Sequence, residues 1–239
     1  MRLALLISGG GTTMEAIIKA SQDGRLPKIE PRLIISSNQE AGGIEKAKKL
    51  GIKSEDILVI HPKNFASREE FGEAIIRECE KRKIDFIGQY GWHILTPGNV
   101  IEKFRGNIIN QHPGPLDIGK LDFGGAGMFG MRVHQTRLEF VRKVNRDFWT
   151  EATTHYVTED FDKGKIIKRK QIPILLEDTA ETLQKRVLLI EHEVQIEALK
   201  DFSEGKVIEF KREVPLVFPG EEKTLKECKE MAIKMYPKG

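Results

Sequence analysis

Residues 3–20 read LALLISGGGTTMEAIIKA, and they pass from one type of secondary structure to another within a few positions. The short apolar run at 3–7 is typical of a buried strand, and the glycines at 9–11 allow the backbone to turn tightly. Apolar residues then recur at helical spacing until Gly24, a typical helix stop. A strand that leads through a glycine turn into a helix begins a β-α-β unit, so this stretch predicts a parallel sheet.

The same alternation continues toward the middle of the chain. Ser67 and Glu70 have the spacing of a capping box at the start of one helix, and Thr96 before Pro97 is a typical start of another. Repeated β-α alternation argues for an α/β fold with helices on both faces of the sheet. The predicted strands lie at 3–7, 32–37, 56–62, 84–91 and 106–113, and the predicted helices at 13–24, 43–51, 67–81 and from Pro97.

The pattern changes after the fifth strand. Residues 114–130 are loop-like and rich in glycine. The segments expected next are a helix at 131–144, two strands within 152–174, a long amphipathic helix at 178–202 and a last strand at 205–210. The tail from residue 211 contains Pro215, Pro219 and one short helical pattern, so we divide the chain into a main domain, residues 1–210, and a C-terminal extension, residues 211–239.

The composition limits the classes of function. The 239 residues include 39 basic and 36 acidic side chains, a net charge of +3, which provides no broad basic field for nucleic acid but allows a local site for a small anion. Cys79 and Cys228 are the only cysteines, so neither a disulfide framework nor a cysteine-based metal site is indicated. No stretch approaches membrane-spanning length, and the first apolar run is too short for a signal peptide. We expect a cytoplasmic protein with small-molecule substrates and no nucleic-acid or membrane partner.

The turn at residues 7–16 is a candidate anion site. Gly10 and Gly11 bring the backbone N–H groups of a helix N-terminus within reach of a ligand, and Thr12 and Thr13 add hydroxyl donors. The alternative is an ordinary strand-to-helix turn. Met14 occupies the third glycine position of the dinucleotide-binding pattern, and no Gly-Lys-Ser/Thr follows, so neither nucleotide motif is complete.

Asn110 and His112 end the fifth predicted strand, within the sequence IINQHPGP at 108–115. Residues i and i+2 of a strand point to the same face, and the carboxyl edge of a parallel sheet is where ligands bind. An amide and an imidazole directed at one point suit an oxyanion. A histidine satisfied by backbone groups is the alternative, although the Pro-Gly-Pro sequence that follows argues against its burial in a regular element.

Other ionisable residues are open to two interpretations each. Asp162 lies in the acidic turn EDFDKG, where a solvated hairpin loop is the simpler interpretation for Glu159 and Asp160. His155 begins the preceding strand and is equally suited to a structural role. Glu191 follows three apolar residues in the long helix, so it either pairs on the helix surface or holds a ligand. No metal-binding pattern such as HExxH is present.

Several of these segments together resemble the folate-dependent formyltransferase family, in particular its phosphoribosylglycinamide formyltransferase branch (glycinamide ribonucleotide transformylase). The resemblance covers residues 1–210, which it implies form the catalytic domain. Asn-x-His-Pro followed downstream by His-x-Val-x₄-Asp-x-Gly is specific to the family, and the glycine-rich first turn points to the ribonucleotide branch. The segments that carry the resemblance are LLISGGGTTMEAII, SREEF, INQHPGPL, GGAGMFGMRVH, THYVTEDFDKGKII and RVLLIEHE.

The resemblance implies a Rossmann-like, mostly parallel sheet and transfer of a formyl group from 10-formyltetrahydrofolate to the amine of 5-phosphoribosylglycinamide in de novo purine biosynthesis. Asn110 would donate to the formyl oxygen, His112 would stabilise the developing negative charge, and Asp162 would orient the imidazole or relay protons. No metal is implied, and the enzyme would be a monomer or homodimer.

The resemblance also implies two sets of binding residues, with His155 as support for the catalytic group. The ribonucleotide would be bound by Gly10, Gly11, Thr12, Thr13 and Glu191, and the folate by Arg68, Trp92, His93, Ile94, Leu95, Thr158, Glu159 and Asp160. The chain departs from the family's usual residues at Glu151, His93 and Gly114.

Two alternatives remain open on sequence grounds. One is a related formyltransferase or formyl-folate hydrolase with a different acceptor. The other is a folate- or nucleotide-binding protein without catalytic activity, although binding alone does not require the combination of Asn110, His112 and Asp162.

Overall fold

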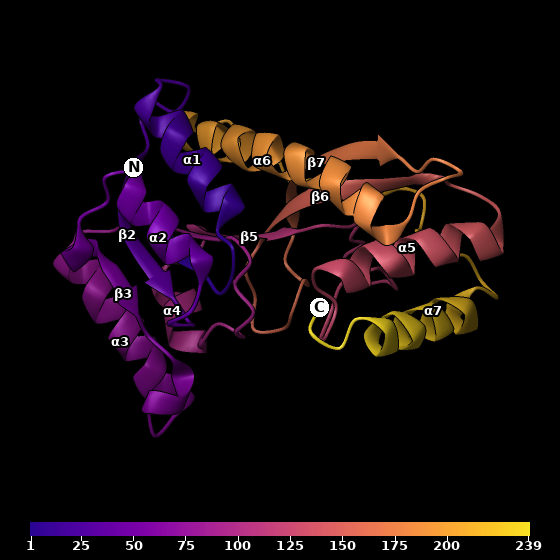
Figure 1. Cartoon of the computed structure of the whole chain (residues 1–239), viewed down its shortest axis with the longest axis horizontal. Helices are drawn as coiled ribbons and strands as arrows, with labels where there is room; N and C mark the ends of the chain where they lie inside the picture. Colours follow the sequence, from indigo (N-terminus) through magenta and orange to yellow (C-terminus); the bar gives the residue numbers. More distant parts are fainter.

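The computed structural model describes residues 1–239 and contains one seven-stranded sheet in the order β3-β2-β1-β4-β5-β6-β7 (Figure 1). The first five strands are parallel, and the last two are antiparallel to their neighbours. The strands are β1 (Arg2–Ile7), β2 (Glu30–Ser36), β3 (Ile57–Val59), β4 (Phe86–Gln89), β5 (Ile108–His112), β6 (Trp149–Tyr156) and β7 (Ile166–Pro173). The predicted mostly parallel α/β fold is therefore confirmed.

Seven α-helices connect or flank these strands (Figure 1). They are α1 (Thr12–Gln22), α2 (Gly42–Lys49), α3 (Arg68–Lys81), α4 (Gly98–Lys103), α5 (Met131–Val144), α6 (Ala180–Glu204) and α7 (Glu222–Met235). The Ser67 hydroxyl accepts from the Glu70 N–H at 3.1 Å, as the capping pattern predicts, while the Glu70 carboxylate accepts from the Ala66 N–H at 3.0 Å. The helix expected from Pro97 begins one residue later, with Pro97 as its N-cap.

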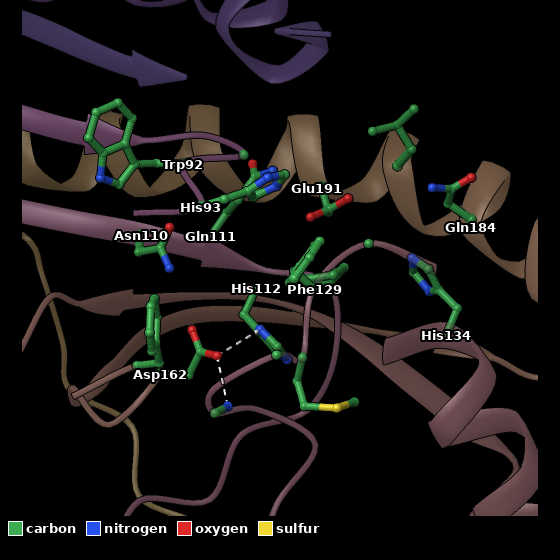
Figure 2. A pocket seen from close by; sticks show the side chains of 18 residues that line it. Trp92, His93, Asn110, Gln111, His112, Phe129, His134, Asp162, Gln184 and Glu191 are labelled. Atoms are coloured by element: carbon green, nitrogen blue, oxygen red, sulfur yellow. Dashed lines mark hydrogen bonds and ion pairs between the residues drawn. The ribbon is translucent and has the colours of Figure 1, made fainter. Parts of the chain in front are cut away.

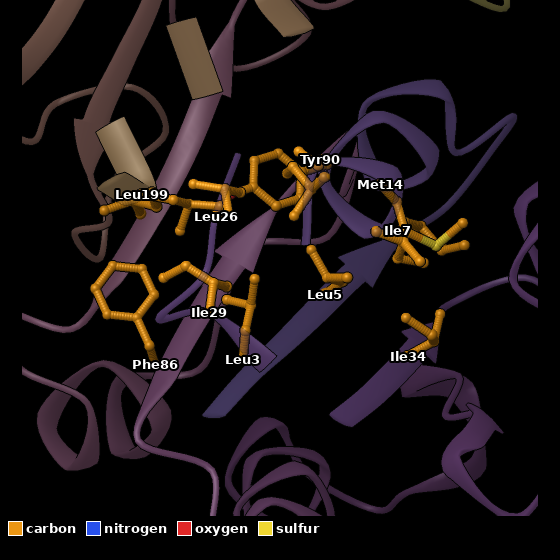
Figure 3. Packing of buried hydrophobic residues seen from close by; sticks show 14 of the residues in the cluster. Leu3, Leu5, Ile7, Met14, Leu26, Ile29, Ile34, Phe86, Tyr90 and Leu199 are labelled. Carbon is orange, nitrogen blue, oxygen red and sulfur yellow. The ribbon is translucent and has the colours of Figure 1, made fainter. Parts of the chain in front are cut away.

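Alternate residues of β1 fill two separate apolar layers, one on each face of the sheet. Leu3, Leu5 and Ile7 pack with the apolar face of α1 and with Leu199 of α6 (Figure 3). Ala4 and Leu6 pack in the opposite cluster, against α3 and α4. Each of these β1 side chains is fully buried. The sheet is covered by helices on both faces, as the β-α alternation predicts.

One predicted strand is wrong. Residues 205–210 form no strand; α6 continues to Glu204, and Gly205 then ends it in the left-handed conformation with φ 68°. Only Phe210 pairs with the sheet, through a single antiparallel bridge to Ile166. Ile208 is 78% exposed, so this apolar run does not cover a core. The run passes the edge of β7 without adding a full strand to it.

The extension (residues 211–239) returns to α5 rather than to the parallel half of the sheet. Figure 1 shows α7 alongside α5. Leu216, Leu225 and Cys228 share a hydrophobic cluster with residues that flank and form the start of α5. The extension and α5 therefore bury one another. No helix of the chain is both long and apolar enough to cross a membrane.

Candidate active site

The end of β5 places Asn110 and His112 on one face, at the carboxyl edge of the parallel strands. β6 runs antiparallel beside β5 and sets His155 opposite Asn110 in the register. The two side chains meet, with the Asn110 amide nitrogen 3.3 Å from His155 Nε2. His155 Nδ1 lies 2.8 Å from the Tyr156 carbonyl oxygen and donates to it, which holds the ring with Nε2 toward the Asn110 amide. His155 thereby fixes the orientation of the amide.

Asp162 comes from the loop between β6 and β7 and reaches the same group. Its backbone is left-handed, with φ 57°, and its side chain is buried. One carboxylate oxygen lies 3.5 Å from His112 Nδ1 and accepts from the Gly125 N–H at 2.9 Å (Figure 2). The other oxygen lies 3.4 Å from His155 Nε2. The carboxylate therefore lies between the two imidazoles.

The protonation states follow from these contacts. Burial raises the pKa of Asp162, but His112, His155 and the Gly125 N–H together favour the charged carboxylate, and the net effect is a lowered pKa. Burial lowers the pKa of His112, and the Asp162 carboxylate offsets that shift only in part. The other nitrogen of His112 faces the Phe123 carbonyl oxygen at 3.2 Å. Both ring nitrogens thus face oxygens, so the imidazole is placed to become an imidazolium when negative charge develops beside it.

A cavity of about 220 Å³ opens beside these three residues (Figure 2). Its walls come from the end of β4, β5, the glycine-rich loop (residues 122–130), the start of α5, the Asp162 loop and α6. Six residues expected from the sequence line it, namely Trp92, His93, Asn110, His112, Asp162 and Glu191. The structure therefore brings the three expected catalytic residues, one expected ribonucleotide residue and two expected folate residues to one space.

A second, smaller cavity of about 20 Å³ adjoins the first. Its lining includes Trp92, Ile94, Leu95, Thr158 and Asp160, all expected to bind folate. The two cavities share Trp92, Asn110, Phe161 and Asp162. Asn110 and Asp162 therefore lie where the two spaces meet, which is the arrangement required for transfer between two bound molecules.

Three groups of expected site residues do not line either cavity. Residues 10–13 lie nearby, because the Ser8 N–H donates to the Gly91 carbonyl at 2.9 Å and the Ser8 hydroxyl accepts from the His93 N–H at 3.0 Å. The Arg68 guanidinium donates to the Thr96 carbonyl at 3.1 Å, beside the smaller cavity. Glu159 is exposed. Of the three groups, only residues 10–13 are linked, through Ser8, to the segment that lines the larger cavity.

Several buried polar atoms around the cavities have no partner in the protein. One oxygen of Glu191 is unpaired, although the residue is only 5% exposed, and burial raises its pKa to about 8. The Trp92 indole N–H and His134 Nδ1 are also unpaired. Burial lowers the pKa of His134 to about 3, so this ring is neutral. Buried polar groups are rarely left unsatisfied, which points to a polar ligand in the larger cavity.

The sequence did not single out several residues of the larger cavity. Gln184 and Leu188 precede Glu191 by seven and three positions, so the three share one face of α6, a spacing that sequence inspection could have used. His134 lies in the first turn of α5, directly after the glycine-rich loop. Phe129 packs against His93 with ring centroids 4.7 Å apart, a contact between distant segments that no local pattern predicts.

The three departures from the family pattern have structural explanations. His93 forms the contact with Phe129. A Cβ atom at Gly114 would lie 2.5 Å from a Val133 methyl, so no larger residue fits without movement. Glu151 is fully buried in β6 and pairs with Arg169 and Arg212. No cluster of three or more His, Cys, Asp or Glu side chains has the geometry of a metal site.

Sequence comparisons agree with this geometry. A family profile described as formyl transferase matches residues 1–199. The chloroplastic phosphoribosylglycinamide formyltransferase of Vigna unguiculata is 31% identical over 90% of this chain and 65% of its own length. The human trifunctional purine biosynthetic protein adenosine-3 is 32% identical over 86% of this chain and 19% of its own length. The chain thus spans less than two thirds of each of these two longer relatives.

Solved structures of similar length match more completely. Glycinamide ribonucleotide transformylase 1 from Symbiobacterium toebii has a TM-score of 0.74 and 30% identity, with coverage of 87% of this chain and 90% of that one. Phosphoribosylglycinamide formyltransferase from Brucella melitensis has a TM-score of 0.72 and 35% identity, with coverage of 87% and 98%.

Proposed function

This chain belongs to the formyl transferase family, and we propose that it transfers the formyl group of 10-formyltetrahydrofolate to the primary amine of 5-phosphoribosylglycinamide, a step of de novo purine biosynthesis. The observation that carries the proposal is the meeting of Asn110, His112 and Asp162 at the junction of two cavities. One cavity would hold the acceptor amine and the other the formyl donor.

The reaction requires charge stabilisation at one oxygen. The neutral amine attacks the formyl carbon, a C–N bond forms, and the carbonyl electron pair moves to oxygen. The Asn110 amide, oriented by His155, is placed to donate to that oxygen, and His112 as an imidazolium adds electrostatic stabilisation. The intermediate then collapses, the bond to the folate nitrogen breaks, and the amine proton moves to that nitrogen.

Asp162 supports this step in two ways. Its lowered pKa keeps the carboxylate charged beside His112, which favours the protonated imidazole at the moment of attack. The carboxylate also lies at the junction of the cavities, where it can accept the amine proton directly or through water. Both roles require the ionised carboxylate that the two flanking imidazoles stabilise.

The larger cavity and the glycine turn suit a phosphorylated sugar. Glu191 is buried there with an unpaired oxygen, which ribose hydroxyls could satisfy. The N-terminus of α1, with Gly10, Gly11, Thr12 and Thr13, would bind the phosphate through its free N–H groups. The link through Ser8 keeps this turn beside the cavity.

The residues around the smaller cavity suit one edge of the folate, because the space itself, about 20 Å³, is far smaller than a pteridine ring. Trp92, Ile94, Leu95 and Thr158 offer apolar surface and short polar groups, and the Trp92 indole N–H has no partner in the protein. This segment would hold the pteridine ring with the formyl group directed toward Asn110. Arg68 and Glu159, farther out, would contact the more exposed part of the folate.

The direct test supplies purified protein with 10-formyltetrahydrofolate and 5-phosphoribosylglycinamide and follows the formylated product, with a reaction lacking the acceptor as control. Formylated product that appears only with the acceptor supports the proposal. Release of free formate without the acceptor would identify a hydrolase instead, and absence of either reaction despite folate binding would contradict the assigned acceptor.

A further inference from the structure

The extension contacts the glycine-rich loop through a lysine. Lys229 on α7 donates from Nζ to the Gly124 carbonyl oxygen at 2.8 Å. The side chain is half-buried, and burial lowers the pKa of its ammonium, while Asp122 and Asp162 oppose that shift. The lysine therefore extends inward from α7 toward the candidate active site rather than outward into solvent.

The Gly124 carbonyl lies between two backbone groups that touch the candidate catalytic residues. The carbonyl of the preceding Phe123 faces His112 Nε2 at 3.2 Å, and the N–H of the following Gly125 donates to the Asp162 carboxylate at 2.9 Å. A rotation of this short segment would change both contacts together. The bond from Lys229 to the carbonyl between them opposes that rotation.

The segment also has little freedom to shift sideways. A Cβ atom at Gly124 would lie 2.8 Å from the Cβ of Asp162 and 2.6 Å from a Leu116 methyl. The Gly124 backbone thus packs directly against Asp162, and a small displacement of one moves the other. Catalytic groups depend on such supports, because a misplacement of about 1 Å can reduce a rate by about 10²-fold.

A second contact anchors the other end of the loop to the extension. Arg132 donates from Nη1 to the Gly127 carbonyl at 2.9 Å, and from Nε and Nη2 to the carbonyls of Tyr236 and Pro237 at 2.8 Å each. Its guanidinium also lies 4.6 Å from the centroid of Phe129. Lys229 and Arg132 therefore both attach the loop to the extension, and Lys229 is the attachment next to His112 and Asp162.

We propose that Lys229 is a positioning residue for formyl transfer, which acts through the Phe123–Gly125 backbone to hold His112 and Asp162 in their reactive arrangement. This inference rests on the proposed function of those two residues. The lysine lines neither cavity, so its loss should affect the rate of the chemical step more than the binding of either substrate.

The experiment compares Lys229→Met with Lys229→Arg and with Lys226→Met, a control three residues earlier on the exposed face of α7. Steady-state kinetics give kcat and both KM values, and NMR hydrogen exchange reports the Gly125 amide, with the β1 amides as an internal reference for global stability. We expect Lys229→Met to lower kcat about 10-fold or more with KM values within about twofold, and to accelerate Gly125 exchange about 10-fold.

Lys229→Arg should restore most of the kcat and most of the protection of the Gly125 amide from exchange. Lys226→Met should match the parent protein in both measurements. Unchanged kcat and Gly125 exchange in Lys229→Met would overturn the proposal, and so would a fall in kcat without faster exchange. If Lys229→Met does not fold, Lys229→Gln provides a neutral side chain that keeps a donor. If the parent protein shows no formyl transfer, the proposed function fails, while the exchange of Gly125 still tests the positioning role.

Discussion

Glu151 and Glu191 both bury a carboxyl group, but the protein supplies partners for that group only in the region around Glu151 and not in the cavity around Glu191. Glu151 is fully buried in β6, and its carboxylate pairs with Arg169 of β7 and Arg212 of the extension. Glu191 is almost as deeply buried on α6, yet one of its oxygens has no partner in the protein. A buried carboxyl group with all its partners supplied by the protein belongs to the structure, whereas an unsatisfied one points to a ligand that completes the hydrogen bonding.

Asp162 shares features with both Glu151 and Glu191. It is buried and well paired, like Glu151, but its partners are imidazoles and a loop N–H at the edge of a cavity rather than guanidinium groups inside the fold. Imidazole as a chemical group can exchange a proton during a reaction, whereas a guanidinium stays charged. The comparison therefore distinguishes a carboxylate that holds the fold together from two whose surroundings fit the roles proposed for them in binding and in chemistry.

The largest expected effect is that of Asp162→Asn on turnover. Loss of the charge removes the group that favours protonated His112, so kcat should fall by about 10³-fold, within the range of general acid–base contributions. Substrate dissociation constants, measured by calorimetry, should change by less than about fivefold. Asp23→Asn, an exposed and distant position, is the control. Turnover near the parent value would contradict the assigned role.

Glu151→Gln should give the next largest effect, and it should act on stability. The change leaves the buried Arg212 guanidinium and the partly exposed Arg169 guanidinium without a carboxylate, so the free energy of unfolding should fall by about 3 kcal/mol, as expected for a broken buried ion pair. Chemical denaturation measures the loss. Glu209→Gln, whose pair with Lys165 is largely exposed, should change stability by less than about 1 kcal/mol. Equal losses of stability in Glu151→Gln and Glu209→Gln would refute the distinction between a buried and an exposed ion pair.

The sequence predicted more of the site than of the contacts that support it. Asn110, His112 and the glycine turn are local: each lies at a strand end that apolar runs and prolines identify. The pairing of Glu151 with Arg212 and the reach of Lys229 to Gly124 join residues 61 and 105 positions apart. Such contacts depend on how α7 and the extension pack on α5, and no short-range pattern encodes that packing.

Glu191→Gln should affect binding rather than folding. If the carboxylate accepts hydrogen bonds from the ribose, the KM for 5-phosphoribosylglycinamide should rise about 10-fold, while the KM for the folate should stay within about twofold. Glu193→Gln is the matched control, because Glu193 lies on the same helix and pairs with Lys170 at the surface. Equal KM changes for both substrates would indicate a general distortion instead.

The smallest effect is the dependence of stability on pH that Glu191 introduces. Burial raises the pKa of Glu191 from an ordinary 4.5 to about 8 in the folded protein, so between these values the folded state binds more protons than the unfolded state. Stability therefore declines as pH rises from about 4.5 to about 8, by at most about 1.4 kcal/mol per pH unit.

Between pH 6 and 7 we expect the unliganded parent protein to lose about 1 kcal/mol relative to Glu191→Gln, which has no carboxyl proton to release. Chemical denaturation of both proteins at the two pH values isolates this difference, because the other ionisable groups are common to both. Parallel pH profiles would show that Glu191 is already paired in the free protein. A difference that disappears when the ribonucleotide is bound would show that the ligand supplies the missing partner.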